Sequence, residues 1–515
     1  MLADPSAQHR RLSEAQTEQL LDDLRGLLGA DRVLTGTDIR EQHAVDESFH
    51  PAAAPDAVVY PESTEEAAAI VGVCARHRAP IVPFGAGTSL EGHVQALAGG
   101  VTVDMREMNR IVRLSIEDLD VTVQAGVTRK QLDAALRPEG VFFPVDPGAD
   151  ATIGGMVSTG ASGTTTVRYG AMRENVLSLT VVTADGEIVR TRSRARKSSS
   201  GYDLTRLFIG AEGTLGLVCE ATLRVRPTPE AMSAAVCGFP SLRDAVDCVV
   251  SVSQHGIPVA RIELLDEMLI EAINRHANMD HAVAPTLFLE FHGTPDEVEA
   301  QAAETEEIAT EHGGEGFRWA TDEAERRRMW EARHGAYDAT RALRPGTSAL
   351  TTDACVPVSG LADAVLQTRA DLDEHGLTGS ILGHVGDGNF HVTLLVDADD
   401  PADVERGMRF HDRVVRRALE HGGTCTGEHG VGYGKAGYLE LEHGPKAVAM
   451  MRAIKHALDP DDIFNPGKVV DAAAAGAGDG APAARAGGGA PAAPAGDGAP
   501  AAADAAGPAH PSQPA

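Results

Sequence analysis

The spacing of apolar residues in the first part of the chain predicts alternating helices and strands. Apolar positions recur at helical spacing over residues 13–28. Short apolar runs at Val58–Tyr60 and Ile81–Pro83 are typical of buried strands. Between them, Ser63–Glu66 forms a capping box that opens a helix ending near His77. This part of the chain therefore predicts strand–helix–strand units.

The pattern changes after Pro227-Thr-Pro229, where glycines become rare. Apolar strands such as Val259–Leu264 and Thr286–Phe291 alternate with long amphipathic helices. The helices that the periodicity predicts span residues 296–311, 323–341, 361–374 and 403–421. We interpret this second half as a separate domain.

The segment Leu382–His391, Leu-Gly-His-Val-Gly-Asp-Gly-Asn-Phe-His, predicts a hairpin with two histidines on one face. Asp387-Gly388 favours a two-residue type I′ turn, in which both central residues need positive φ. In that register His384 faces His391, with Cβ atoms about 5 Å apart. Two imidazoles so placed could share a metal ion, and Glu428-His429 supplies further donors. Surface histidines on a polar hairpin are the alternative, but the two segments together favour a metal site.

Three glycine-rich segments are the other chemical signal. They are Phe84–Leu90, Pro147–Gly163 and Gly210–Gly216. The first can turn successive N–H groups toward phosphate oxygens, and the small residues of the second let backbone lie against a large planar ligand. The first segment lacks the lysine of a Walker loop and the Gly-x-Gly-x-x-Gly spacing, so for it alone an ordinary tight turn remains open.

Composition narrows the function classes. A formal net charge of −30 over 515 residues argues against binding nucleic acid, or docking on an anionic membrane by charge alone. The six cysteines form no Cys-x-x-Cys motif, which argues against a local zinc ribbon or iron–sulfur motif and indicates a reducing compartment. No apolar run is long enough for a transmembrane segment, and no export signal is evident. We expect a cytoplasmic protein, with a peripheral place on the inner face of the membrane as an alternative.

The last part of the chain differs from everything before it. From Asp471 onward Ala, Gly and Pro dominate, without apolar periodicity. Such a composition cannot bury enough apolar surface to order itself. We predict a disordered tail over residues 471–515.

Eight short segments occur in a characteristic order. They are Pro83–Gly92, Pro147–Gly155, Arg168–Gly170, Lys197–Leu204, Gly210–Gly216, Gly383–His391, Gly427–Gly430 and Asn465–Lys468. In this order they resemble the FAD-dependent D-2-hydroxyacid dehydrogenases. That group of vanillyl-alcohol-oxidase-like flavoproteins includes cytochrome-type D-lactate dehydrogenase and the glycolate oxidase flavin subunit. Each segment is weak evidence alone, whereas eight in order are specific. The resemblance covers residues 46–470.

The resemblance implies an α+β fold. It places an FAD-binding domain of two α+β subdomains at residues 51–228, after an N-terminal helix and connector at residues 1–50. A cap domain with an antiparallel sheet flanked by helices would span residues 229–425. Residues 426–470 would return to the FAD-binding domain.

The resemblance also implies site residues. His384, His391 and Glu428 match the ligands of a divalent metal, for which Zn²⁺, Mn²⁺ and Fe²⁺ are all compatible. His429 matches the catalytic base, and Arg333 matches the residue that binds the substrate carboxylate. No residue matches a covalent attachment site, so FAD is expected to bind noncovalently. The implied FAD-binding residues are Pro83, Gly85, Ala86, Gly87, Thr88, Ser89, Leu90, Pro147, Gly148, Thr152, Gly154, Gly155, Ser158, Thr159, Gly163, Tyr169, Glu212, Gly213, Gly216 and Asn465.

The implied reaction is oxidation of a small D-2-hydroxy acid. D-lactate is the substrate that the resemblance favours, and glycolate is the alternative. Electrons would pass to a quinone, a cytochrome or another carrier. Related D-2-hydroxyglutarate dehydrogenases carry a lysine shortly before the residue matched to Asp353, where this chain has Thr351-Thr352. That departure favours a monocarboxylate.

Other interpretations stay open at this point. A flavin-free metal hydrolase would leave the three glycine-rich segments without a task. Arg333 alone could be a surface arginine packed on Trp330. The sequence does not define the oligomeric state, and a homodimer is compatible with it.

Overall fold

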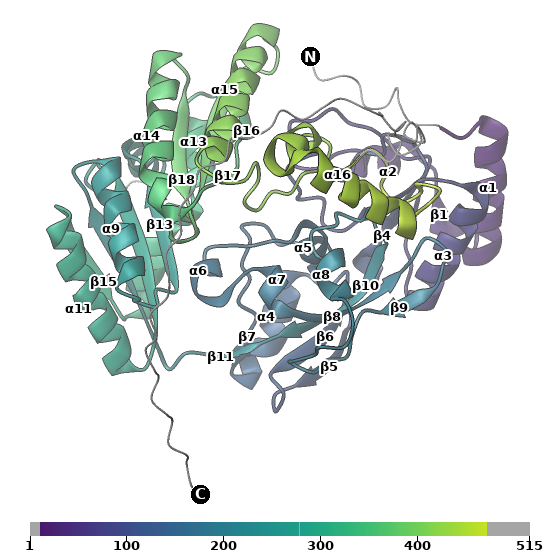
Figure 1. Ribbon diagram of the computed structural model, residues 1–515, viewed down its shortest axis with the longest axis horizontal. Helices are drawn as coiled ribbons and strands as arrows, with labels where there is room; N and C mark the ends of the chain where they lie inside the picture. The colour runs from purple at the N-terminus through teal and green to yellow at the C-terminus, as the bar shows by residue number, and fades with distance from the viewer. Residues whose placement is uncertain (1–10, 278, 471–515) are drawn as a thin grey trace, which may run out of the picture. The chain divides into compact units, whose positions relative to one another are not determined.

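A computed structural model describes residues 11–277 and 279–470 of the chain. The predicted tail (471–515) lies outside these residues. The described residues form sheets of four, five and eight strands, together with a two-stranded ribbon, and helices that cover them. The fold is α+β (Figure 1).

The first sheet, with strand order β1-β2-β4-β3, is the N-terminal one. Its strands are β1 (Val33–Leu34), β2 (Ala57–Val59), β4 (Val101–Asp104) and β3 (Ile81–Phe84), and only β1 pairs antiparallel. Helices α1 (Glu14–Leu28) and α3 (Thr64–His77) bury Leu20, Leu24 and Ile70 in the same apolar cluster as these strands. The short α2 (Thr37–Gln42) leads into β2.

The second sheet is antiparallel throughout, with strand order β5-β6-β10-β8-β9. Its strands are β5 (Ile111–Ser115), β6 (Asp120–Gln124), β10 (Leu217–Arg224), β8 (Val176–Val182) and β9 (Ile188–Arg190). The helices of this part are α4 (Arg129–Leu136), α5 (Ile153–Thr159), α6 (Thr166–Tyr169), α7 (Met172–Asn175) and α8 (Leu204–Phe208). A ribbon of β7 (Val141–Phe142) and β11 (Arg226–Pro227) lies at the point where the chain leaves it.

The third sheet is antiparallel, with strand order β15-β12-β14-β13-β18-β19-β16, and β17 also pairs with β19. Its strands are β12 (Ala231–Gly238), β13 (Arg261–Leu265), β14 (Thr286–Gly293), β15 (Glu315–Ala320), β16 (Ser348–Thr351), β17 (Ala354–Cys355), β18 (Gly379–Gly383) and β19 (Asn389–Val396). Figure 1 shows α9 (Leu242–Gln254) and α11 (Pro295–Glu311) lying alongside it.

Alternation along the strands gives this sheet two different faces. Ile262 and Val392 point into the larger apolar cluster, which α9, α11, α14 (Val358–Glu374) and α15 (Pro401–Glu420) complete. Their neighbours Glu263 and His391 point to the opposite face. Helices α10 (Glu267–Ala277), α12 (Glu323–His334) and α13 (Ala336–Ala342) also pack on that face. Polar side chains on a central strand are therefore buried without entering the main core.

The C-terminal segment returns to the first sheet. After η6 (Ala436–Tyr438) and α16 (Leu439–Leu458), the chain runs beside β3. The amide of Ile81 donates to the carbonyl of Ile463 (2.7 Å), and the amide of Asn465 donates to the carbonyl of Ile81 (2.8 Å). Phe464 is fully buried in the same cluster as β3. The last described residues are therefore part of the N-terminal core.

The predicted two-residue turn of the histidine hairpin is wrong. His391 pairs with Leu382 rather than with His384, and a 3₁₀ turn over Val385–Asp387 joins β18 to β19. Only Gly388 has positive φ in this turn (+79°), and its carbonyl accepts from the amide of Val356 (3.0 Å). Pairing with the segment around β17 therefore outweighs the local preference of Asp-Gly.

A second prediction also needs correction. The helix expected over residues 323–341 is two helices, α12 and α13, with Gly335 between them. Glycine is a poor residue for a helix interior, because its backbone loses the most conformational freedom on ordering.

Candidate active site

A cavity of about 900 Å³ lies against all three glycine-rich segments. Its volume is in the range of small-molecule and cofactor sites, about 300–1,000 Å³. Its lining also includes Arg333, His384, His391, Glu428 and His429. The structure thus brings these five predicted residues together, although they come from three separate segments of the sequence.

Glycines let the walls of the cavity approach each other closely. A Cβ at Gly85 would lie 2.3 Å from Thr152 Oγ1 of the second glycine-rich segment. A Cβ at Gly213, where φ is +69°, would lie 2.7 Å from Pro83 Cγ. The three segments therefore contact one another only because these positions lack side chains. This arrangement leaves backbone at the cavity wall, where a flat cofactor and its phosphates would fit.

Tyr169 is the exception among the predicted FAD-binding residues, because it does not line the cavity, whereas the other nineteen do. Its hydroxyl donates to His292 Nδ1 (2.8 Å) on β14. His292 Nε2 donates in turn to Glu290 (2.7 Å). Tyr169 thus connects α6 to the eight-stranded sheet.

His384, His391 and Glu428 form a compact donor group. The Nε2 atoms of His384 and His391 lie 3.4 Å and 3.1 Å from the same oxygen, Glu428 Oε1. The donor atoms of the three residues all lie within 4.8 Å of one another. His391 Nε2 is buried without a well-aligned hydrogen bond. Two imidazoles and a carboxylate suit Zn²⁺, Mn²⁺ or Fe²⁺, so the residues fit a divalent metal.

The other ring nitrogens of the two histidines are already occupied. His384 Nδ1 donates to Glu263 (2.6 Å), and His391 Nδ1 donates to the carbonyl of Thr352 (3.1 Å). Such contacts fix the tautomer of a metal-binding histidine, with the free lone pair on Nε2. Burial opposes charge on His384, but the Glu263 and Glu428 carboxylates outweigh it and raise the pKa of His384 well above its ordinary value, so a divalent cation would have to displace a proton from Nε2. Both histidines are therefore held with Nε2 toward Glu428.

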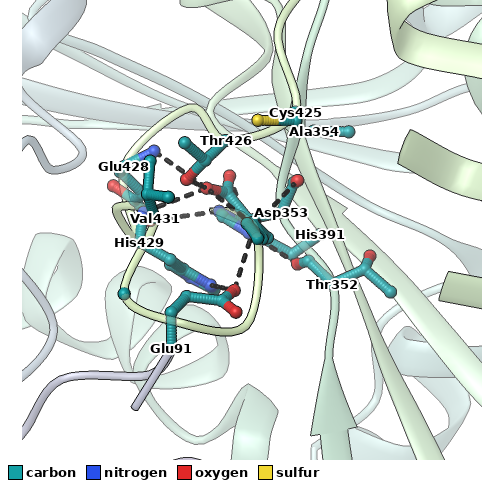
Figure 2. Close-up of polar contacts among 12 residues, drawn as sticks. Glu91, Thr352, Asp353, Ala354, His391, Cys425, Thr426, Glu428, His429 and Val431 are labelled. Atoms are coloured by element: carbon teal, nitrogen blue, oxygen red, sulfur yellow. Dashed lines mark hydrogen bonds and ion pairs between the residues drawn. The ribbon is translucent and has the colours of Figure 1, made fainter. Parts of the chain in front are cut away.

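Asp353, between β16 and β17, holds the segment that carries Glu428 and His429 (Figure 2). Its fully buried carboxylate accepts from the amides of Glu428 and His429 (both 2.9 Å) and from the hydroxyl of Thr426 (2.7 Å). Its other oxygen accepts from the Asn389 side chain (2.8 Å). Asp353, His391 and His429 also form a close group. We favour the His384–His391–Glu428 group for a metal, because Asp353 already accepts these four hydrogen bonds.

His429 lies parallel to His391, with ring centroids 5.0 Å apart. Its Nδ1 is 3.9 Å from Glu91, which forms an ion pair with Lys435 (3.0 Å). Burial lowers the pKa of His429 below its ordinary value, although Asp353 opposes that shift. A neutral imidazole at this place can accept a proton from a bound molecule.

Arg333 is held by a residue that the sequence reasoning missed. Its Nε donates to Glu263 (2.9 Å), so Glu263 contacts both Arg333 and His384. The surface arginine packed on Trp330 is not what the structure shows, because the guanidinium over Trp330 belongs to Arg261 (5.1 Å). The one available signal for Glu263 was a charged residue within the apolar strand Arg261–Leu265.

Comparisons with known proteins agree on the type of protein. Residues 55–192 match the family model of the FAD binding domain, and residues 228–469 match that of the C-terminal domain of FAD linked oxidases. The chain is 52% identical over 460 residues to the probable mitochondrial D-lactate dehydrogenase of Danio rerio. This alignment covers 89% of this chain and 93% of that protein. It is 44% identical over 455 residues to the mitochondrial D-lactate dehydrogenase (cytochrome) of Arabidopsis thaliana, covering 88% and 80%.

Solved structures show the same fold. The crystal structure of p-cresol methylhydroxylase with substrate bound aligns with a TM-score of 0.73 at 18% identity, covering 89% of this chain and 98% of that one.

Among the described residues, no helix is both long and apolar enough to cross a membrane.

We predict that Gly87→Val weakens flavin retention. Gly87 has φ +73°, and a Cβ there would lie 2.9 Å from Phe84 Cζ. Relieving about 1–3 kcal/mol of strain by moving the loop would weaken flavin binding about 5- to 150-fold. The measurement is the ratio of flavin to protein absorbance after gel filtration.

Gly140→Val is the matched control for strain. Gly140 also has positive φ (+69°), but it has open space around it and lies outside the cavity. It should keep its flavin even if its melting temperature falls. Full flavin occupancy in Gly87→Val would contradict the role given to this loop.

Proposed function

Because the chain belongs to the family of FAD-linked oxidases, we propose that it is an FAD-dependent dehydrogenase of small D-2-hydroxy acids, with D-lactate as its main substrate. The product is the 2-oxo acid. The D-lactate dehydrogenases of Danio rerio and Arabidopsis thaliana, at 52% and 44% identity, support this substrate. FAD would be bound noncovalently.

One observation carries the proposal. The cavity that the three glycine-rich segments line is also lined by Arg333, His384, His391, Glu428 and His429. A cofactor site and a site for a hydroxy acid therefore share one cavity. A metal hydrolase would need the donor group but not the glycine-rich walls, and a binding protein for FAD would need the walls alone.

The two bound groups would supply chemistry that side chains lack. FAD, against the glycine-rich segments, would supply an acceptor for a hydride, that is, for two electrons and a proton together. A divalent cation held by His384, His391 and Glu428 lowers the pKa of a hydroxyl group that binds it.

The residues of the chain bind the substrate and move its proton. Arg333 lines the cavity and is positioned to bind the substrate carboxylate, which fixes how C2 is presented. His429 is positioned to accept the hydroxyl proton, because burial lowers the pKa of its imidazole below the ordinary value and so favours the neutral form.

The substrate end favours a monocarboxylate. Its lining includes Arg333 and Arg261, and Arg261 is already paired with Asp146 (3.1 Å) and Glu290 (3.4 Å). Ala349 and Thr351 also line the cavity. A second substrate carboxylate would therefore have no unpaired cation there among the described lining residues.

The electron acceptor, the location and the oligomeric state are further proposals. A quinone, a cytochrome or another carrier stays the proposed electron acceptor. A cytoplasmic location stays a prediction. The word "mitochondrial" in the names of the two relatives describes those proteins. A homodimer likewise stays a prediction.

We predict that D-lactate is the best substrate in an assay with an artificial dye as acceptor. Its kcat/KM should exceed that of D-2-hydroxyglutarate by about 10- to 150-fold, since a missing charge-assisted hydrogen bond costs about 1.5–3 kcal/mol. Glycolate should be oxidised more slowly than D-lactate, because it lacks the methyl group. Equal kcat/KM values for D-lactate and D-2-hydroxyglutarate would contradict the monocarboxylate assignment.

His391→Ala should lower both metal content and turnover, because two remaining protein ligands hold a divalent ion poorly. Metal per flavin is measured by emission spectrometry after dialysis. A chelator should reproduce this loss in the unmodified enzyme and do little further to the variant. If the chelated enzyme kept full turnover on D-lactate, the donor group would have no part in the reaction.

His429→Ala should keep FAD and metal but reduce kcat about 10²- to 10⁴-fold, the usual contribution of a general base. His443→Ala, an exposed histidine on α16, is the control and should leave kcat unchanged. A wild-type kcat in His429→Ala would transfer the role of base to another group.

A further inference from the structure

Glu263 is a buried carboxylate with two partners of different kinds. It lies on β13, and its side chain has no exposed surface. One oxygen accepts from His384 Nδ1 (2.6 Å), and the other accepts from Arg333 Nε (2.9 Å). Both partners line the cavity. A single carboxylate thus joins the donor group for a metal to the arginine for the substrate carboxylate.

The contact with His384 decides which ring nitrogen is available. Because Nδ1 donates to Glu263, the lone pair of a neutral His384 lies on Nε2, which is 3.4 Å from Glu428. A carboxylate in this position also makes the imidazole a stronger ligand.

The contact with Arg333 decides how the guanidinium is presented. It uses Nε, and among the described residues no hydrogen bond of Arg333 uses a terminal nitrogen, so both can bind a ligand in the cavity. A carboxylate can bind two such donors at once.

Stability alone is a weak reason to bury this carboxylate. Desolvation of buried charges often cancels their mutual attraction, so such pairs add little net stability. An apolar residue of similar size would fit an apolar strand equally well.

We propose that Glu263 is a positioning residue that sets the geometry of the metal-binding and carboxylate-binding groups together. This inference rests on the proposed function. Loss of the Glu263 charge disturbs both groups at once: His384 loses its fixed tautomer, and Arg333 loses its anchor.

The chain offers a matched control one strand away. Glu290 on β14 lies opposite Arg261 and binds it (3.4 Å), and it also accepts from His292 Nε2 (2.7 Å). It is a second buried Arg–Glu–His arrangement, but His292 is not part of the donor group for a metal. Glu290→Gln therefore reports what the loss of a buried charge costs the fold.

The test uses the full-length holoenzyme with Glu263→Gln and Glu290→Gln. We measure Zn²⁺ and Mn²⁺ bound per flavin in metal-buffered solutions, together with KM and kcat for D-lactate, flavin content and melting temperature. In Glu263→Gln we expect metal affinity to fall about 10- to 100-fold, the usual effect of losing such a partner, and KM to rise, with flavin retained. In Glu290→Gln we expect metal affinity to stay at the wild-type value, whatever its melting temperature.

The outcomes distinguish a failure of the proposed function from a failure of the inference about Glu263. If the wild-type enzyme binds neither Zn²⁺ nor Mn²⁺, the proposed site for these two metals fails, and the inference that Glu263 sets its geometry fails with it. If it binds metal and Glu263→Gln matches its metal affinity and KM, only the inference fails. It also fails if Glu290→Gln loses metal to the same extent. If Glu263→Gln does not fold, Glu263→Asp keeps the charge on a shorter side chain. A weakened metal affinity with a raised KM in that variant supports the inference, and wild-type values overturn it.

Discussion

The buried carboxylate of Asp353 is the constraint on which the active site depends. It accepts from two successive amides, those of Glu428 and His429, so that both side chains leave the loop at defined positions. Burial opposes its charge, but His429, Lys435 and His391 outweigh that effect and keep the pKa of Asp353 below its ordinary value. The charge in turn strengthens each hydrogen bond that the carboxylate accepts. These hydrogen bonds hold Glu428 within 3.4 Å and 3.1 Å of His384 and His391 of the eight-stranded sheet.

Buried lysines perform a similar task between the C-terminal segment and the walls of the cavity. Lys435 binds Glu91 (3.0 Å), Lys455 donates to the carbonyl of Thr214 (2.9 Å), and Lys468 donates to the carbonyl of Gln95 (2.8 Å). Each Nζ thus binds an acceptor far away in sequence, in or beside the glycine-rich segments. Lysines are seldom fully buried unless they are paired. Their positions explain how the last described residues help to close a cavity formed mainly by the first half of the chain.

Alternation in the eight-stranded sheet connects stability to chemistry. The same strands place Ile262, Val392 and Leu350 in the core and Glu263, His391 and Thr351 on the other face. A shift of one residue in the register would exchange these two sets, so the packing of the core fixes the site. The sheet can therefore hold charged groups rigidly, because its other face is a continuous apolar cluster.

The sequence by itself determined the local features and the kind of protein. Serine caps, glycine-rich loops and the order of eight short segments each depend on residues close together in the chain. They predicted the first helices, the cavity walls and five residues that the structure brings together. The tertiary structure decided how those residues meet. His384 approaches His391 through a 3₁₀ turn and not through the predicted register, because β17 pairs with β19 beside it. Tyr169 contacts His292 instead of the cavity. The roles of Glu263 and Asp353 could not be assigned from their neighbours in sequence, because a buried charge is defined by partners that here lie 36 to 121 residues away. Pairing at that distance is set by the packing of whole sheets, which no local pattern records.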